Sequence, residues 1–482
     1  MPDPFARYGT SGKLFIYFAT VVMALVGTVL TVRLGPEKGI LVGGGLLGLV
    51  LVYVTLINFR FGFYAATTVS FFIFFLGRFL GDSVPVGSLI DILIFANFFG
   101  LIFRKVMDRE PFFKDTRHII TSLYLLYTLF IIAELFNPSM HSMEGWLLVF
   151  RKYIQFLMVY FISLHIFTTP DATYKYFRYW AILSLIAGGY GCIQEWFGFL
   201  PFEEAWIKSA PGREKLYILV GGVSRRFSTF SDPAAFGIIM GATFPMVLVF
   251  FIYGKNWASR IVYFFILLFV ILGVAYSGTR TAYFIIIAAI AVFVVMTITN
   301  KRTLVFACLF ILGFMALMFG PFYGNPTINR IRSTFEFSED ASLQVRDINR
   351  AYIQPYIYRH PIGGGLATSG LQGKEFNPNH YLAGFPPDSG FVKTAVETGW
   401  VGLFLQCLIY FFILQSGAHA YFRSGSEKNK HIILAMMVCA FAFIVGQYGQ
   451  VAIGQFPGVF LFYGCLGAIA KAGYWENKIV KT

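Results

Sequence analysis

Apolar runs of close to twenty residues follow one another along most of the chain. A helix needs about 20 predominantly apolar residues to cross the hydrocarbon core of a bilayer, so each run is predicted to be a membrane-spanning helix. We therefore expect an all-α polytopic membrane protein with about 14 transmembrane helices. The predicted spans cover residues 14–32, 39–58, 62–80, 86–103, 117–136, 149–168, 179–198, 234–253, 260–278, 281–299, 303–322, 389–414, 431–450 and 456–472.

Basic residues are concentrated in alternate connections between these runs, and this orients the helices. Cytoplasmic connections of membrane proteins carry an excess of Lys and Arg. With the amino terminus inside, both termini are cytoplasmic and an even number of spans follows. The first run lacks a small-residue cleavage site behind it, so we expect a retained helix and not a removed signal peptide. The cytoplasmic basic residues would be Arg104, Lys105, Arg109, Lys114, Arg117, Lys175, Arg178, Lys255, Arg260, Lys301, Arg302, Arg423, Lys428, Lys430, Lys478 and Lys481.

Two connections depart from this pattern, because both are basic and both are predicted to lie outside the cytoplasm. The first is an extracytoplasmic loop over 199–233, and the second is a large extracytoplasmic (periplasmic) loop over 324–388. Long loops tolerate such charge, but the first loop is rather short and rich in arginine, which favours an anion-binding site. The two loops contain Lys208, Arg213, Lys215, Arg225, Arg226, Arg330, Arg332, Arg346, Arg350, Arg359 and Lys374.

The large loop is predicted to contain an amphipathic helix from Ser342 to His360, because apolar positions recur there at helical spacing. Pro361 ends this helix, and the triple glycine at 363–365 follows it. Consecutive glycines can cradle phosphate through their N–H groups. On its own, however, the triple glycine favours a turn.

The composition supports a membrane protein and excludes a soluble one. Charged residues make up 13% of the chain and hydrophobic residues 57%, whereas soluble domains carry about 25% charged residues. The net charge of +14 suits a cytoplasmic face against anionic lipid, so no nucleic-acid partner is expected. The five cysteines lie in apolar runs, and none has a histidine at metal-ligand spacing. We therefore expect no disulfide, no metal site and no cofactor.

Asp388 stands where the large loop enters an apolar helix. A helix N-cap explains an aspartate at this position, and a capping carboxylate can also act as a base. Lys393 and Glu397 lie four residues apart in the same helix. Ionisable groups inside a membrane are costly, so these two are expected either to pair with each other or to line a polar cavity.

Arginines are predicted to converge on the same outer face. Arg225 and Arg226 precede the eighth span, and Arg280 lies between the ninth and tenth. Such arginines can extend to lipid phosphate at the membrane edge. Alternatively, their guanidinium groups can bind phosphate bidentately and stabilise a pyrophosphate leaving group.

A carboxylate near these arginines could take the proton from an attacking sugar hydroxyl. His380 is a candidate second proton carrier or acceptor-sugar contact. The remaining candidate substrate-binding residues in the large loop are Arg346 and Arg350.

Three segments of the chain resemble the O-antigen ligase and O-antigen polymerase superfamily of bacterial envelope glycosyltransferases. The first is Arg226-Phe-Ser-Thr-Phe-Ser-Asp-Pro233, and the second is Ser277-Gly-Thr-Arg280-Thr-Ala. The third combines His360-Pro361-Ile-Gly-Gly-Gly365 with Val396-Glu-Thr-Gly-Trp-Val-Gly-Leu403. The match covers roughly 225 to 405, and the flanking spans agree in hydropathy alone.

The resemblance implies a metal-independent, inverting C-type glycosyltransferase in the bacterial inner membrane with a periplasmic active site. Its donor would be a glycan on undecaprenyl pyrophosphate, and its acceptor a second glycan or lipid A-core. By position, Arg226 and Arg280 would hold the pyrophosphate. Asp388 occupies the position that is the catalytic histidine of the ligases.

This departure at Asp388 favours a polymerase of surface polysaccharide over a ligase, although aspartate can also serve as a base. A transporter of lipid-linked sugars is a third possibility. Transporters show related halves and charged residues near the midplane. This chain concentrates its charge in an outer loop, which favours an enzyme.

Overall fold

The structure is a computed structural model that describes residues 36–80, 87–114, 116–218, 224–254, 256–321, 324–335 and 341–479. Within these ranges the chain is helical, with two isolated β-bridges and no strand. The expected all-α fold is therefore confirmed. The predicted first span, 14–32, lies outside the described residues.

The long helices are α2 (Pro36–Ile57), α3 (Phe59–Leu80), α4 (Gly87–Met107), α5 (Ile119–Ala133), α6 (Met143–Ile166), α7 (Pro170–Phe197), α10 (Pro233–Ile252), α11 (Trp257–Ser277), α12 (Arg280–Met296), α13 (Lys301–Phe319), α17 (Gly390–Arg423), α18 (Glu427–Gly449) and α19 (Gly458–Ile479). The remaining helices are η1 (Glu134–Phe136), α8 (Pro201–Lys208), α9 (Glu214–Tyr217), α14 (Pro326–Ser333), α15 (Ala341–Arg359) and α16 (Gly370–Phe376).

Every predicted span from 39–58 onward coincides with one of these long helices in the described part of the chain. Eight helices there are long and apolar enough to cross a membrane, and Gly43–Ile57 and Arg280–Met296 are shorter apolar segments. The protein is thus a multi-span membrane protein, while the total of about 14 spans stays a prediction.

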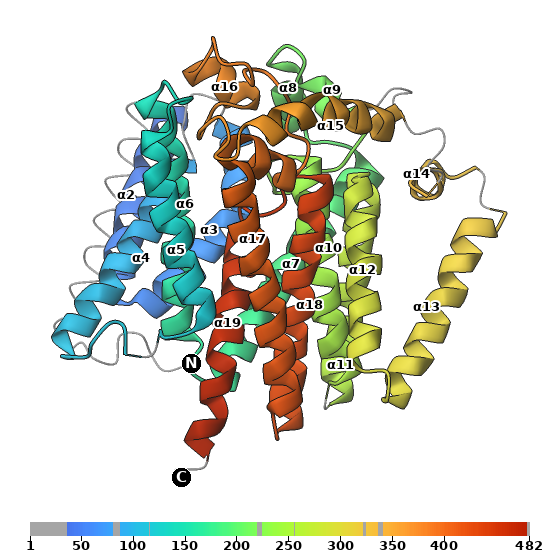
Figure 1. The fold of residues 1–482 in the computed structure, drawn as a ribbon. Coiled ribbons are helices and arrows are strands. Elements are labelled where there is room, and N and C mark those ends of the chain that lie inside the picture. Colours follow the sequence, from blue (N-terminus) through green and yellow to red (C-terminus); the bar gives the residue numbers. More distant parts are fainter. Residues whose placement is uncertain are drawn as a thin grey trace.

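The long helices stand side by side and alternate in direction (Figure 1). The helices α8, α9, α15 and α16 gather at one end, which we call the outer end. The connections α6–α7, α10–α11, α12–α13 and α17–α18 lie at the opposite, inner end. The two connections that break the charge pattern therefore share one end of the bundle.

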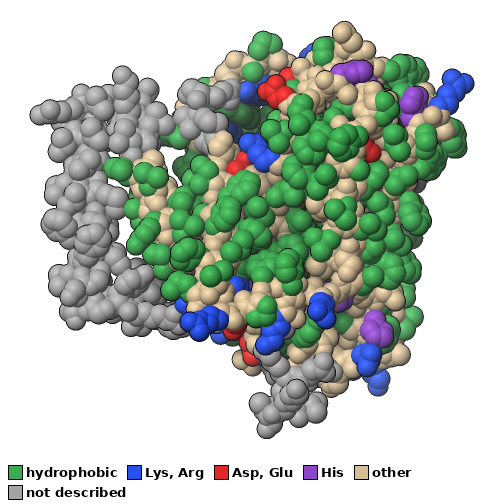
Figure 2. All heavy atoms as spheres, turned by 60° about the vertical axis from the view of Figure 1, so that its left-hand side comes forward, with side chains coloured by type: hydrophobic (Ala, Val, Ile, Leu, Met, Phe, Trp, Pro, Cys, Tyr) green, Lys and Arg blue, Asp and Glu red, His purple; other side chains and the backbone are tan. Residues whose placement is uncertain are grey.

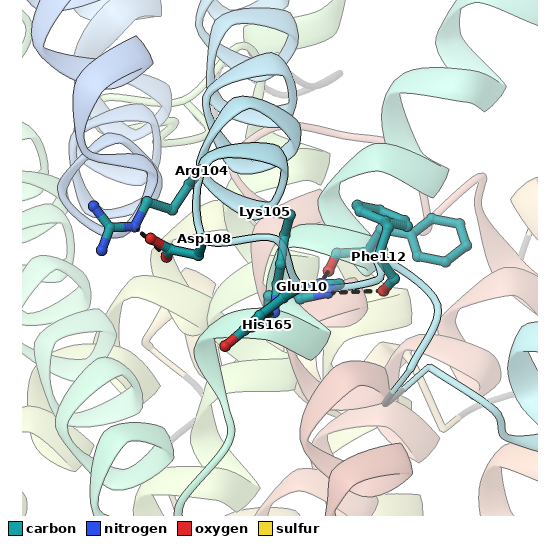
Figure 3. Close-up of polar contacts among 7 residues, drawn as sticks. Arg104, Lys105, Asp108, Glu110, Phe112 and His165 are labelled. Atoms are coloured by element: carbon teal, nitrogen blue, oxygen red, sulfur yellow. Dashed lines mark hydrogen bonds and ion pairs between the residues drawn. The ribbon is translucent and has the colours of Figure 1, made fainter.

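The inner end holds basic residues paired with acidic ones. Arg104 bonds to Asp108 and Lys105 to Glu110, both at 2.6 Å (Figure 3). His165 Nε2 lies 3.2 Å from the Phe112 carbonyl oxygen in the same view. Figure 2 shows an apolar face with Lys and Arg side chains gathered along its inner border. The positive-inside rule would make this border the cytoplasmic one.

The core is centred on α10 and α18. Most side chains of α10 are fully buried, so this helix is apolar all round and surrounded by other helices. α13, by contrast, has one buried residue, Thr303, and stands at the margin of the bundle (Figure 1).

α17 consists of two helices that meet at Gly399, where φ is 63° and ψ is −161°. The rings of Phe391 and Tyr410 lie 5.9 Å apart, although 19 residues of continuous helix would separate them by about 28 Å. The chain therefore folds back at Gly399. The single span expected over 389–414 is wrong in this respect: it is divided into a short arm, 390–398, and a long arm, 400–423.

The large loop packs against this turn. The helix α15 covers Ala341–Arg359, where the sequence predicted an amphipathic helix from Ser342 to His360. The N–H groups of Gly364 and Gly365 donate to the carbonyl oxygens of Val396 and Glu397, both at 2.8 Å. The triple glycine is thus bonded to the short arm of α17, which favours the turn interpretation over a phosphate cradle.

Candidate active site

A cavity of about 610 Å³ lies at the outer end, between the end of α7, the α11–α12 turn and α14. Three arginines line it, Arg225, Arg226 and Arg330, together with one acidic residue, Glu195. The other lining residues are Trp196, Ser224, Leu272, Ala275, Tyr276, Gly278, Asn325, Thr327, Ile328 and Ile331. The cavity is therefore cationic and partly apolar.

The segment that carries Arg225 and Arg226 is anchored at both of its ends. The Arg226 N–H donates to the Tyr276 carbonyl oxygen at 3.0 Å. At the other end, Asp232 caps α10 by accepting from the N–H groups of Ala234 and Ala235, both at 2.9 Å. Pro233 occupies the first turn of that helix, where its missing N–H costs nothing.

Arg225 is held by three protein oxygens. Its guanidinium donates to the Ser277 carbonyl at 3.0 Å, the Leu216 carbonyl at 3.3 Å and the Thr279 hydroxyl at 3.0 Å. Burial lowers the pKa of this group, while Asp232 acts in the opposite direction. With these donors occupied, Arg225 is suited to fixing the α11–α12 turn more than to binding a ligand.

The α11–α12 turn depends on Gly278. This residue is left-handed, with φ 58°, and an added Cβ would meet the Arg330 Nε at 3.0 Å. A glycine is therefore required both by the backbone and by the neighbouring arginine. Arg280 begins α12 directly after this turn.

Arg226 pairs with Glu195. Its Nε donates to the carboxylate at 2.8 Å, and its guanidinium carbon lies 4.7 Å from the Phe199 ring centroid. The ion pair uses Nε, so the two terminal NH2 groups of Arg226 take no part in it. Sequence reasoning missed Glu195, since its position in an apolar helix gave no signal.

Arg330 is the functional candidate that the motifs did not identify. Its Nε donates to the Gly278 carbonyl oxygen at 2.8 Å, and the group forms no ion pair with a described carboxylate. Burial, with the charges of Arg280 and Arg225, lowers its pKa to about 10. Arg330 thus stays protonated at neutral pH and adds a third cation around Arg280. Its place in an arginine-rich outer loop was the available signal.

Asp388 is half-buried and precedes Ser389, which occupies the N-cap position of α17. Ser389 makes no side-chain cap bond, and its hydroxyl donates to the Gln447 carbonyl oxygen at 2.9 Å. Across the described residues, nothing joins the Asp388 carboxylate to the first turn of α17. The structure therefore offers no support for Asp388 as a helix cap.

The end of α18 links Asp388 with Arg280. The Gly390 N–H donates to the Gln450 carbonyl at 3.3 Å, so α17 begins against the end of α18. On the other side, a Cβ added at Gly449 would meet the Thr281 hydroxyl at 2.7 Å, so α12 begins there as well. Asp388 is not one of the residues that line the arginine cavity. It lies in the adjoining region, across the end of α18.

Arg350 reaches the same end of α18. Its guanidinium donates to the Tyr448 hydroxyl at 2.8 Å and lies 4.4 Å from the ring centroid. Arg346 is on the same helix, α15, but its side chain lies outside the described residues.

Lys393 and Glu397 have separate partners. The Glu397 carboxylate is buried and accepts from the Ser369 hydroxyl at 2.5 Å, whereas Lys393 Nζ lies 3.5 Å from the Gln372 amide oxygen. The expected i, i+4 pairing between them is thus replaced by contacts with the large loop.

His380 is held within the large loop. Its Nδ1 accepts from the Leu382 N–H at 3.1 Å. Burial lowers its pKa, and His141 and His360 lower it further. His380 is therefore not brought to the arginine cavity, whose lining does not include it. Over the described residues, no group of three or more His, Cys, Asp or Glu is placed to hold a metal ion.

Comparison with known proteins gives a family match. Residues 265–407 match the family model described as O-antigen ligase, and no curated protein matches the chain. The matched segment contains the α11–α12 turn, α14, α15 and the turn of α17. The match supports a glycosyltransferase-like function of the ligase or polymerase type in surface polysaccharide synthesis. The resemblance to the O-antigen ligase and polymerase superfamily is therefore confirmed, over a segment that includes Arg280, Arg330 and Asp388.

Proposed function

We propose that this protein polymerises undecaprenyl-pyrophosphate-linked oligosaccharide units on the periplasmic face of the bacterial inner membrane. The observation that carries the proposal is the outer cavity lined by Arg225, Arg226 and Arg330. Such a cluster suits a diphosphate, because guanidinium groups donate paired hydrogen bonds to phosphate oxygens. The topology, with cytoplasmic termini and a periplasmic site, rests on the positive-inside rule.

In the proposed reaction, Arg226, Arg280 and Arg330 bind the donor diphosphate. The hydroxyl of the acceptor glycan attacks the anomeric carbon of the donor sugar, and Asp388 accepts the hydroxyl proton. The bond between that carbon and the diphosphate oxygen breaks, so the configuration inverts. Undecaprenyl diphosphate leaves, and its additional negative charge is stabilised by the arginines. No metal ion takes part in this scheme.

Glu195 has a defined place in the scheme. Its ion pair with Arg226 holds the guanidinium beside the cavity before substrate binds. Arg225 positions the α11–α12 turn through its bonds to Ser277 and Thr279. Arg350 and His380 belong to the large loop and are proposed to contact the acceptor glycan. Glu397 supports this loop through Ser369.

The alternative is a ligase that performs the same chemistry with lipid A-core as acceptor. The family model favours this alternative by its description, whereas the aspartate at 388 favours the polymerase. A transporter is the third candidate, and the concentration of half-buried arginines at one end of the bundle argues against it.

The deciding experiment supplies the purified protein in phosphatidylcholine nanodiscs with an undecaprenyl-pyrophosphate oligosaccharide, with and without lipid A-core. Ladders of longer lipid-linked glycan without core would support the polymerase. A single transfer to core would support the ligase. Absence of both products, with protein that remains folded, would reject a glycosyltransferase. The matched control is Lys208→Ala, because Lys208 is exposed in the outer loop over 199–233.

A further inference from the structure

Arg78 is a cation buried behind the segment that carries Arg226. It lies in the last turn of α3 and is 4% exposed. α3 is long and apolar enough to span the membrane, and burying a charge in such a helix is costly. A basic residue in the last turn of a helix commonly serves the carbonyl groups of its own helix. Arg78 instead reaches a segment about 150 residues further along the chain.

Two donors of Arg78 hold the backbone that follows Arg226. Nη1 donates to the Phe230 carbonyl oxygen at 3.0 Å, and Nη2 donates to the Ser228 carbonyl oxygen at 2.6 Å. A guanidinium presents its donors in a fixed planar geometry, whereas a lysine ammonium is a single flexible point. Arg78 therefore fixes the positions of two carbonyl groups at once.

Ser228 needs this support because its backbone is left-handed. Its φ is 52°, which is uncommon outside glycine and persists where the surroundings enforce it. The Ser228 N–H donates to the Gln194 amide oxygen at 2.8 Å, and the hydroxyl donates to the Ala187 carbonyl oxygen at 2.6 Å. Gln194 in turn donates to the buried Glu203 carboxylate at 2.9 Å. The chain two residues after Arg226 is thus held from both α3 and α7.

A series of aromatic contacts also joins Arg78 to Arg226. The Arg78 guanidinium carbon lies 4.3 Å from the Phe227 ring centroid. The rings of Phe227 and Phe199 are stacked, with centroids 5.1 Å apart and 19° between their planes. The Arg226 guanidinium carbon lies 4.7 Å from the Phe199 ring centroid. Cation–π and stacking contacts therefore run without a break from the buried arginine to the cavity arginine.

We propose that Arg78 is a positioning residue, which holds the Arg226 guanidinium at the outer cavity where the donor diphosphate binds. Arg78 is not part of the cavity lining and touches no substrate in the proposed reaction. It acts through the carbonyl groups of Ser228 and Phe230 and through the two stacked rings. This inference rests on the proposed function, because it takes Arg226 as a ligand of the donor diphosphate.

The test is a double-mutant cycle on the affinity for undecaprenyl diphosphate in phosphatidylcholine nanodiscs. Arg78→Lys keeps the charge and loses the planar pair of donors, so it should weaken binding by about tenfold, within the range of coupled residues. The same change made in Arg226→Ala should weaken binding no further, because the group that Arg78 positions is already absent. Equal weakening in both backgrounds would show a general structural role and overturn the proposal. Unchanged affinity of Arg78→Lys would overturn it as well.

Two further variants keep the test decisive. Arg60→Lys makes the same change at an exposed position of α3 and should bind like wild type. If Arg78→Lys does not fold, Phe199→Leu replaces it in the cycle, since it removes the ring between Phe227 and Arg226. Its effect should likewise vanish in Arg226→Ala, and an effect that persists there would overturn the proposal.

Binding is measured without turnover, which separates this inference from the proposed function. A protein that shows the predicted dependence on Arg226 but transfers no sugar would reject the proposed function alone. A protein that transfers sugar, with equal weakening in both backgrounds, would reject the positioning role alone. A wild type that binds no undecaprenyl diphosphate would overturn both.

Discussion

The basic residues at the two ends of the bundle are partnered in different ways. At the inner end, Lys105 and Lys430 each form a short ion pair with a nearby carboxylate, Glu110 and Glu427. At the outer end, Arg225 and Arg330 are half-buried and donate to backbone carbonyl and hydroxyl oxygens. The charges of Lys105 and Lys430 are compensated by carboxylates of the protein, whereas Arg225 and Arg330 form no ion pair with a carboxylate among the described residues.

This difference indicates two separate reasons for positive charge. Exposed ion pairs contribute about 0.2–1 kcal/mol each, and at the inner end they fit the orientation of the helices in the membrane. Neutral oxygens orient a guanidinium but leave its charge uncompensated. We propose that a cluster of such groups around Gly278 meets an anion from outside. Arg226 falls between these two cases, because it lies at the outer end but its charge is compensated by Glu195.

The largest effect is expected from Asp388, a carboxylate at the outer end that forms no ion pair among the described residues. Asp388→Asn keeps the size of the side chain and removes its basicity. Loss of a general base should lower the turnover of sugar transfer by about 10²–10⁴-fold. Binding of undecaprenyl diphosphate, measured in parallel, should not change. Full activity in Asp388→Asn would remove the base assignment.

A somewhat smaller loss of transfer rate is expected from substitutions of the cavity arginines. Removing one preorganised donor to a developing oxyanion costs about 10²–10³-fold in rate, so Arg330→Ala should fall in this range. Arg226→Ala should also lose activity, and it leaves Glu195 without its partner. The double variant Arg226→Ala/Glu195→Gln separates the two effects. Recovery of full activity in the double variant would mean that Arg226 only neutralises Glu195.

Gly399→Ala tests the turn that places Asp388. An added Cβ would lie 2.0 Å from the Pro361 carbonyl oxygen, and φ is 63°. Strain of this kind costs about 1–3 kcal/mol before the clash is counted. The melting temperature in detergent should therefore fall, together with activity. Gly313→Ala, in α13 with no atom within 4 Å of the added Cβ, is the control and should melt like wild type. An equal melting temperature for Gly399→Ala would contradict the folded-back arrangement of α17.

The smallest effect is expected at the inner end. Lys105→Ala removes an exposed ion pair and should change stability by about 1 kcal/mol or less. Its transfer rate should equal that of wild type, measured in the same nanodisc assay. A large loss of transfer in this variant would break the distinction between the two ends.

Much of the fold was predictable from the sequence, because hydropathy alone locates helices in a membrane protein. The positions of α10, α11 and α15 follow from apolar runs and helical spacing. The turn at Gly399 was missed, since 389–414 was interpreted as one span although Lys393 and Glu397 lie in its first part. The close approach of Pro361, far away in the sequence, and the positive φ of Gly399 explain why a glycine stands there.

The candidate site was partly predictable. Arg225 and Arg226 line one cavity, as the two basic loops indicated, and Arg280 begins the helix beside it. The sequence could not reveal that Arg225 is occupied by carbonyl oxygens, or that Glu195 pairs with Arg226. Arg330 lies 50 residues from Arg280 along the chain, and tertiary packing alone brings it to Gly278. These are contacts between distant elements, which local patterns do not encode.

The central claim is that the outer arginines bind a lipid diphosphate, and direct binding tests it best. Undecaprenyl diphosphate is titrated into the wild type, Arg330→Ala and Lys105→Ala in phosphatidylcholine nanodiscs. We predict that Arg330→Ala weakens the donor site by about tenfold or more, corresponding to about 1.4 kcal/mol, and that Lys105→Ala equals wild type. Equal affinity in all three proteins would contradict the account.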